Sequence, residues 1–179
     1  TGWTGSFARN VNNPCAIAST RFNLWSSAPN GTLISPNTGT ATGVPQTLSY
    51  NYKCYEFSGG GPTPAPWGSF DVQYGPSATG PWTTFATISN EAQSLGVCIP
   101  KTHVFTPPAG PLFIRWNATW TAGDFYLAFD DVSIIPTPAC TTPAPGNTVG
   151  PASGCVGDSI LLTLQNNTPG AVVSYQWYE

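Results

Sequence analysis

The sequence predicts an all-β protein, in which a jelly-roll β-sandwich precedes a partial second β module. Three observations support this fold class. Short runs of residues alternate between apolar and polar, turn residues separate the runs, and no stretch keeps a helical period for more than a turn or two. Glycine and proline each occur 19 times in 179 residues, which provides the turns that many short strands require.

The predicted strands follow one another through the first 136 residues, each with one apolar and one polar face. In the clearest example, Leu48, Tyr50 and Tyr52 alternate with polar neighbours. A Gly- and Pro-rich loop at residues 75–81 indicates a hairpin. The expected strands are 16–25, 32–35, 48–57, 70–74, 82–88, 101–106, 112–120 and 125–134. This number of short strands is typical of a sandwich or jelly roll.

The last of these strands contains a break in its alternation. Phe125, Leu127 and Phe129 alternate on one face, and the alternation resumes at Val132 one residue out of phase. A shift of this kind is the mark of an extra residue in one strand. We therefore expect a β-bulge at the acidic pair, residues 130 and 131.

The chain is expected to divide into three parts: a sandwich at residues 1–136, a Pro/Thr-rich linker at 137–150, and the first strands of an incomplete module at 151–179. In that module, strands are expected at 155–164 and 172–178. A cysteine near one strand and a tryptophan on the next resemble the first half of an immunoglobulin-like module. The segment is too short to close such a sandwich, so it is either a fragment or is completed by another chain.

Composition excludes several functional classes. Charged residues make up 7% of the chain, and the net charge is −3, against about 25% charged residues in an average soluble domain. So few basic residues exclude a nucleic acid partner. No run approaches the roughly 20 apolar residues of a membrane-spanning helix. Five cysteines without a Cys-x-x-Cys pair indicate disulfides in an oxidising, extracellular setting.

Several segments, taken in order, carry a resemblance to a known group of proteins. They are 21–25, 48–53, 77–84, 105–110 and 129–134. In this order they resemble the MAM-like, galactose-binding-like jelly-roll modules of large Bacteroidetes cell-surface adhesins. Residues 140–179 resemble the immunoglobulin-like or PKD-like repeats that follow such modules. The resemblance implies export by type IX secretion, a location peripheral to the outer membrane, and a non-enzymatic role in adhesion or in filaments.

The acidic pair is also a candidate metal site. Asp130 and Asp131, completed by Asp124 and by backbone carbonyls, could provide the six to eight oxygen ligands that calcium prefers. Jelly rolls of the kind that this chain resembles often hold a structural calcium beside the final strand. The alternative is that the pair caps the bulge and accepts hydrogen bonds from nearby backbone amides.

Aromatic residues in or beside loops are candidate ligand-binding residues. Trp67, Trp82, Tyr55 and Trp25 could each stack on a sugar ring, and the alternative for each is structural packing. Trp116 and Trp120 continue the apolar face of their strand and are expected in the core.

The cysteines allow more than one pairing. Cys140 with Cys155 is the favoured bridge of the second module. In the sandwich, Cys54 with Cys98 is the first choice, because the strand ends that carry them meet if those strands are antiparallel neighbours. Cys15 with Cys98 is the rival pairing. Either choice leaves one cysteine of the sandwich outside the bridge.

Catalysis is not expected. The single histidine, His103, alternates as a strand residue, and no serine or cysteine nucleophile occupies a recognisable elbow. Hydrolysis of glycosidic bonds needs two carboxyl groups flanking the bond, whereas adjacent Asp130 and Asp131 point apart on a regular strand.

The sequence thus predicts a non-enzymatic extracellular module of a multidomain bacterial surface adhesin or filament. Its expected partners are cell-surface glycans or neighbouring adhesin subunits, with homo-assembly through the open edge of the C-terminal partial module. The alternative is a carbohydrate-binding accessory module of a secreted polysaccharide-degrading enzyme.

Overall fold

The computed structural model describes residues 2–59, 61, 63, 66–89, 97–137, 146–151, 153–157 and 159–166. By its contacts the chain divides into two compact units, Thr1–Pro138 and Ala139–Glu179. All secondary structure within the described ranges is β-strand. No helix able to cross a membrane occurs in them.

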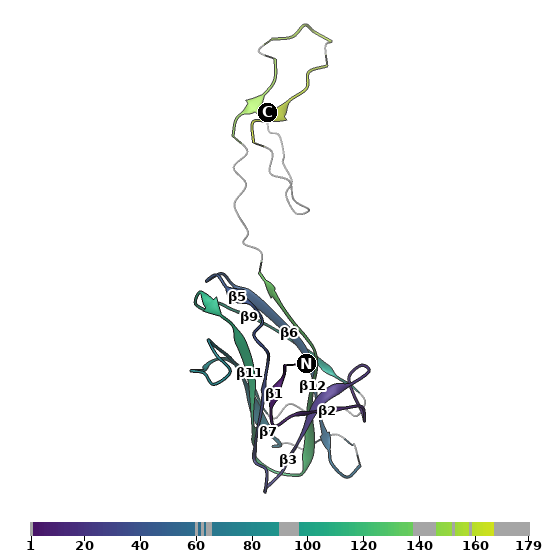
Figure 1. The fold of residues 1–179 in the computed structure, drawn as a ribbon. Coiled ribbons are helices and arrows are strands. Elements are labelled where there is room, and N and C mark those ends of the chain that lie inside the picture. Colours follow the sequence, from purple (N-terminus) through teal and green to yellow (C-terminus); the bar gives the residue numbers. More distant parts are fainter. Residues whose placement is uncertain are drawn as a thin grey trace. The chain divides into compact units, whose positions relative to one another are not determined.

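The first unit is a sandwich of two antiparallel five-stranded sheets (Figure 1). Sheet A has the strand order β1-β4-β11-β7-β8 and sheet B the order β2-β3-β12-β6-β9, while β5 and β10 form a separate short pair. The strands are β1 (Thr4–Gly5), β2 (Ala8–Asn10), β3 (Ser19–Leu24), β4 (Asn30–Ile34), β5 (Thr40–Ala41), β6 (Gln46–Glu56), β7 (Gly68–Gly75), β8 (Thr83–Ser89), β9 (Ile99–Phe105), β10 (Gly110–Pro111), β11 (Phe113–Trp120) and β12 (Phe125–Pro136). The predicted all-β fold and all eight predicted strands of the sandwich are confirmed.

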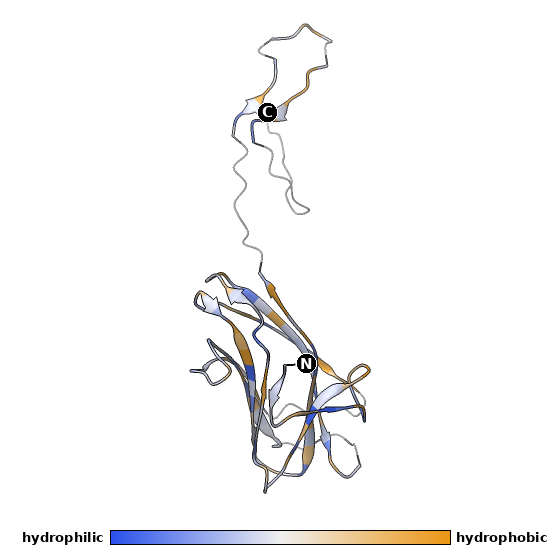
Figure 2. Cartoon of the chain, viewed as in Figure 1, coloured by the Kyte–Doolittle hydropathy of each residue, from blue (hydrophilic) through white to orange (hydrophobic). Residues whose placement is uncertain are grey.

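Alternation places one face of each long strand in a shared core. On β6, Leu48, Tyr50 and Tyr52 are all buried, while on β11 Ile114 and Trp116 are fully buried. Hydrophobic and hydrophilic residues succeed one another along these strands in Figure 2. Aromatic rings dominate the core and meet mostly edge to face or tilted, as their quadrupoles favour. The core assignment of Trp116 is confirmed, and Trp120 is partly buried against the same cluster.

The predicted bulge is present in β12. The register between β12 and β6 shifts between Asp130 and Ser133, so two residues of β12 face Tyr50 alone. Asp131 has a φ of 52°, in the left-handed region, which aspartate tolerates better than most residues. The extra residue returns Val132 and Ile134 to the core side of the sheet, where both pack against the hydrophobic cluster.

The second unit contains one short described strand pair, β13 (Thr148–Val149) with β14 (Thr163–Leu164). The strand expected at 155–164 is therefore strand only in its last two described residues. The strand expected at 172–178 lies outside the described residues. Ile160, Leu161 and Leu162 are exposed by 54%, 78% and 43%, so this apolar run is not buried by the described part of the unit.

Candidate functional site

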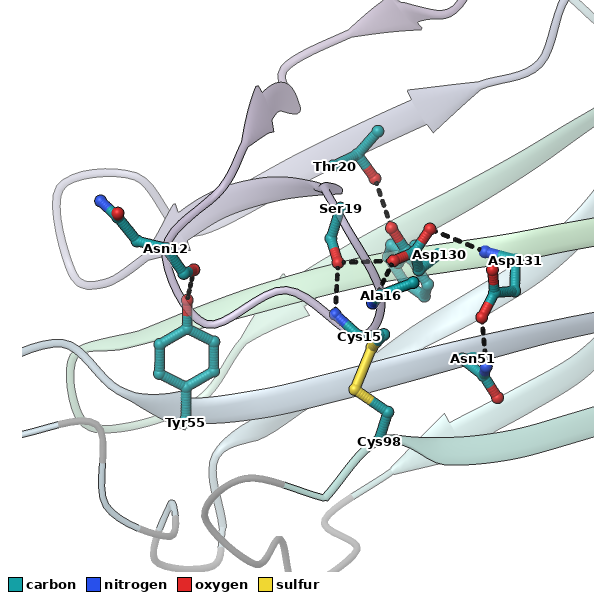
Figure 3. The surroundings of a disulfide bond; sticks show 11 residues. Asn12, Cys15, Ala16, Ser19, Thr20, Asn51, Tyr55, Cys98, Asp130 and Asp131 are labelled. Carbon is teal, nitrogen blue, oxygen red and sulfur yellow. Dashed lines mark hydrogen bonds between the residues drawn. A yellow bond between two sulfur atoms is a disulfide. The ribbon is translucent and has the colours of Figure 1, made fainter.

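The acidic pair at the β12 bulge is held by hydrogen bonds from two other segments, residues 15–19 and β6 (Figure 3). Asp130 Oδ2 accepts the backbone N–H of Ala16 and the hydroxyl of Ser19, both at 3.0 Å. Asp130 Oδ1 accepts the N–H of Asp131 at 2.9 Å. The carboxylate therefore ties the loop before β3 to the bulge, because charge-assisted hydrogen bonds of this kind are among the strong ones.

Asp131 faces away from Asp130. Its Oδ2 accepts a hydrogen bond from the amide of Asn51 on β6 at 2.8 Å. The two carboxylates thus act on different neighbours, one on the loop at residues 15–19 and one on β6. This arrangement matches the alternative interpretation of the pair, in which it caps the bulge and accepts hydrogen bonds from nearby donors.

A surface cavity of about 390 Å³ opens beside this bulge. Three aromatic rings, Trp3, Phe7 and Phe129, contribute to its walls, and its polar lining includes Arg9 and both aspartates. Trp3 directly precedes β1 of sheet A, and Phe7 lies in the short connection from β1 to β2 of sheet B. Their rings pack on the core, with Trp3 6.0 Å from Trp116 and Phe7 5.5 Å from Phe129 between ring centroids.

Calcium at the acidic pair stays a prediction. Three of the roughly four acceptor positions of the Asp130 carboxylate already have donors, so Asp131 and backbone carbonyls would provide most of the ligands. The proposed contribution of Asp124 needs correction. It precedes the first residue of β12, about 20 Å from Asp130 at the rise of an extended strand. The described residues contain no group of three or more His, Cys, Asp or Glu placed to hold a metal.

The disulfide joins Cys15 to Cys98, with the Cα atoms 5.7 Å apart. The preferred pairing of Cys54 with Cys98 is wrong, although β6 and β9 are the antiparallel neighbours that it assumed. Tyr52 lies opposite Ile99, so the next pair along the two antiparallel strands is Lys53 with Cys98. Consecutive residues of a strand point to opposite faces, so Lys53 and Cys98 lie on the face opposite to that of Cys54. Cys54 points into the core, whereas Cys98 meets Cys15 on the outer face of sheet B.

Cys54 is instead a core residue with 1% exposure. The hydroxyl of Thr63 donates a hydrogen bond to its sulfur at 3.4 Å. Burial raises the pKa of the Cys54 thiol to about 12, because a thiolate would lose its hydration there. Of the other predicted bridge, Cys140 lies outside the described residues and Cys155 is exposed, so Cys140–Cys155 stays a prediction.

Two of the candidate sugar-stacking residues are buried, and their assignment to a binding surface needs correction. Trp67 has 0% exposure and packs edge to face on Phe125 in the core. Tyr55 has 2% exposure; its hydroxyl accepts a hydrogen bond from Arg21 and donates one to the carbonyl of Asn12. Both rings therefore stabilise the fold and are closed to a ligand. Trp25 is 40% exposed at a turn.

Trp82 is the candidate whose surroundings suit a ligand. Its partly exposed indole lies against Gly75, where an added Cβ would be 2.9 Å from the ring. The guanidinium of Arg115 lies 4.6 Å from the ring centroid. Arg115 Nε donates to Gln73 at 2.6 Å, and the Gln73 amide donates to Thr84 at 2.9 Å. An aromatic ring beside a guanidinium, an amide and a hydroxyl thus lies on the outer face of sheet A.

His103 is a β9 residue, as predicted. Its Nε2 lies 3.2 Å from the hydroxyl of Tyr50, and its ring packs near those of Tyr50 and Phe85. Burial lowers the pKa of His103, and the charge of Lys101 lowers it further. The imidazole is therefore neutral near pH 7 and serves as a packing residue between rings.

The fold has counterparts of known structure. No family model and no curated protein sequence matches the chain. Among solved structures, a CBM4 module covers 76% of this chain and 95% of its own length at 14% identity and a TM-score of 0.52. A CBM35 module from Paenibacillus barcinonensis covers 76% and 94% at 15% identity and a TM-score of 0.50. The K3 cleaved adhesin domain of Lys-gingipain from Porphyromonas gingivalis covers 75% and 91% at 12% identity and a TM-score of 0.50. This likeness is one of fold: the first unit is a jelly-roll β-sandwich.

Sequence reasoning missed several residues of these surfaces. Trp3, Phe7 and Arg9 line the cavity at the bulge, and Arg115 covers the Trp82 ring. The alternation of Arg115 between Ile114 and Trp116 could have placed it on the outer face of its strand. No sequence signal places the N-terminal segment beside residues that follow it by more than 120 positions.

Proposed function

We propose that this chain is a non-catalytic module of an extracellular adhesin or filament, and that its role is adhesion or assembly. The observation that carries the proposal is the fold, which carbohydrate-binding modules and a cleaved adhesin domain share. The Cys15–Cys98 disulfide supports an oxidising location outside the cell. The acidic pair of β12 supports a structural role, because its oxygens accept hydrogen bonds that fasten a loop and β6 to the bulge.

The second unit supports an assembly role. An exposed apolar run of three residues, Ile160–Leu162, lies between β13 and β14, directly before the second of these paired strands. A strand from a neighbouring subunit would cover this run and extend the sheet, in the manner of β-strand addition. We therefore keep the prediction of homo-assembly through the immunoglobulin-like module at residues 151–179.

A second candidate function, a carbohydrate-binding accessory module, is favoured by the surroundings of Trp82. Glycan sites combine an aromatic surface with a few hydrogen-bonding side chains of fixed orientation. The network of Arg115, Gln73 and Thr84 holds such groups beside the indole. Binding to cell-surface glycans is consistent with either function, since an adhesin also needs a ligand.

An array that presents glycans and extracellular proteins side by side tests both functions. Glycan binding by residues 1–179 that is lost in Trp82→Ala and kept in Trp25→Ala would favour the carbohydrate-binding module. The Trp25→Ala control also removes a partly exposed indole, but from a turn away from Arg115. Binding to protein spots, including the chain itself, with no glycan binding would favour the adhesin. Binding to neither class contradicts both.

A further inference from the structure

The outer half of β12 has one unpaired edge. On one side, β12 pairs with β3 only from Phe125 to Phe129. On the other side it pairs with β6 as far as Pro136. Within the described residues, no strand pairs with the β3-side edge of β12 after Phe129. The segment from Val132 to Pro136 is therefore the edge of sheet B on that side.

The direction of each backbone group on this edge follows from the register. Thr137 N–H donates to the carbonyl of Pro45, and the register pairs Ile135 with Thr47 and Ser133 with Ser49. Hydrogen-bonded pairs alternate along an antiparallel ladder, so these three residues of β12 direct their N–H groups to β6. The groups that point to the open edge are therefore two N–H groups, of Val132 and Ile134, and three carbonyls, of Val132, Ile134 and Pro136, since proline has no N–H.

A groove runs along the same edge. A cavity of about 170 Å³ is lined by Trp3, Ile114, Val132 and Ile134 among others. It shares Trp3 and Val132 with the cavity at the bulge, and Thr38 and Ile134 with a third cavity of about 220 Å³ that reaches Leu112 and Pro136. We call these three adjoining cavities the edge groove. Its walls come from both sheets, so it opens between them beside the unpaired backbone.

The charges of the groove are confined to one end. Arg9, Asp130 and Asp131 line the cavity at the bulge. No described residue lining the other two cavities is charged. An occupant would therefore present uncharged, mainly apolar side chains over Val132–Pro136. A basic residue would suit the end near Asp131, whose carboxylate has one hydrogen bond, from Asn51.

A second copy of the same edge is a poor occupant. Two such edges paired about Ile134 would bring two donors and three acceptors from each side, and Pro136 has no N–H to give to the facing Val132 carbonyl. The Val132 carbonyl of each copy would be left without a donor at a buried junction, which is costly. The edge instead suits a strand with free N–H groups opposite these carbonyls.

We propose that the edge groove accepts an extended segment of a partner protein, which adds to sheet B as a strand beside Val132–Pro136. The segment is uncharged and has apolar residues at alternate positions that enter the groove, with a basic residue toward Asp131. Its backbone N–H groups pair with the free carbonyls, and the N–H groups of Val132 and Ile134 pair with carbonyls of the segment. This inference deepens the proposed assembly role by placing a partner site on the first unit.

Amide hydrogen exchange measured by NMR on residues 1–179 tests the proposal. Without a partner, the amides of Ser133 and Ile135 are protected by β6 and that of Ile134 exchanges fast. The probe is an acetylated heptapeptide of alternating valine and threonine that ends in lysine. At about ten times its Kd, it slows exchange at Ile134 about tenfold, because only the free fraction exchanges. The matched control is the same peptide with alternate amides N-methylated, which keeps the side chains and loses the donors.

Two variants separate the groove from the rest of the strand. Ile134→Arg places a charge in the groove and abolishes peptide binding, while Ile135→Arg alters the neighbouring residue, which is 56% exposed, and leaves binding intact. The proposal is overturned if the Ile134 amide is already protected in the free chain, if it stays unprotected at millimolar peptide, or if the N-methylated peptide binds equally well. These readouts use the native chain, so they hold even if Ile134→Arg fails to fold. If the array is negative but the peptide protects an Ile134 amide that exchanges fast in the free chain, the proposed function is contradicted and this site stands.

Discussion

Removal of the Cys15–Cys98 disulfide should destabilise the first unit strongly. The bridge joins residues separated by 83 positions. In the chain-entropy model, closing a loop of this length lowers the entropy of the unfolded chain enough to stabilise the fold by about 4.5 kcal/mol at 25 °C. We expect the double variant Cys15→Ser/Cys98→Ser to lose about 2–5 kcal/mol, the range found when native disulfides are removed.

The assay is urea unfolding followed by tryptophan fluorescence, in which the buried Trp67 and Trp116 report on the first unit. Wild type measured in excess dithiothreitol should reproduce the double variant. Cys155→Ser provides a control in the other unit, and it should leave the transition of the first unit unchanged. A double variant within about 1 kcal/mol of wild type would refute the reasoning. So would a disulfide-linked peptide containing Cys54 in a non-reducing digest.

Three further predictions concern single sites. Trp67→Ala should lower the free energy of unfolding by about 3–5 kcal/mol, because the indole is fully buried, whereas Trp82→Ala should cost clearly less in the same urea titration. The pKa of His103 in the folded chain is lowered from 6.5, so the unfolded state takes up a proton on this residue at a higher pH than the folded state does. The contribution of neutral His103 to the free energy of unfolding should therefore be fully present above pH 6.5 and should decrease as the pH falls below it. This fall should be shallower in His103→Gln, measured by unfolding at steps from about pH 7.5 to 5. Finally, if Asp130 and Asp131 hold calcium, excess EDTA should lower the Tm of the native protein and added calcium should restore it; an unchanged Tm would exclude a stabilising ion.

The sequence alone determined the class of the fold and most of its strands. Alternation with a period of two is a local property, so Leu48, Tyr50 and Tyr52 reveal a half-buried strand without knowledge of its partners. The bulge was predictable for the same reason. An extra residue in β12 shifts the phase of Val132 relative to Phe129, and this shift is visible in the sequence itself.

Exposure of the aromatic rings could not be predicted from the sequence. Trp67 and Trp82 both lie next to loops rich in glycine and proline, yet Trp67 is fully buried and Trp82 is partly exposed beside Arg115. The difference depends on what covers each ring, and Arg115 follows Trp82 by 33 positions. Local composition indicated where rings occur, and only packing decided which of them a ligand can reach.

The cysteine pairing and the edge groove show most clearly where local information ends. Alternation makes Cys54 an inward residue, but only the register of β6 with β9 shows that Cys98 faces the other way, toward Cys15. The groove arises because β3 ends its pairing at Phe129 while β6 continues to Pro136. The sequence by itself determined which residues form strands and which face of each strand is apolar, since both follow from neighbouring residues. Only the tertiary structure decided which strands lie side by side, and therefore which cysteines meet and which backbone edge is left open.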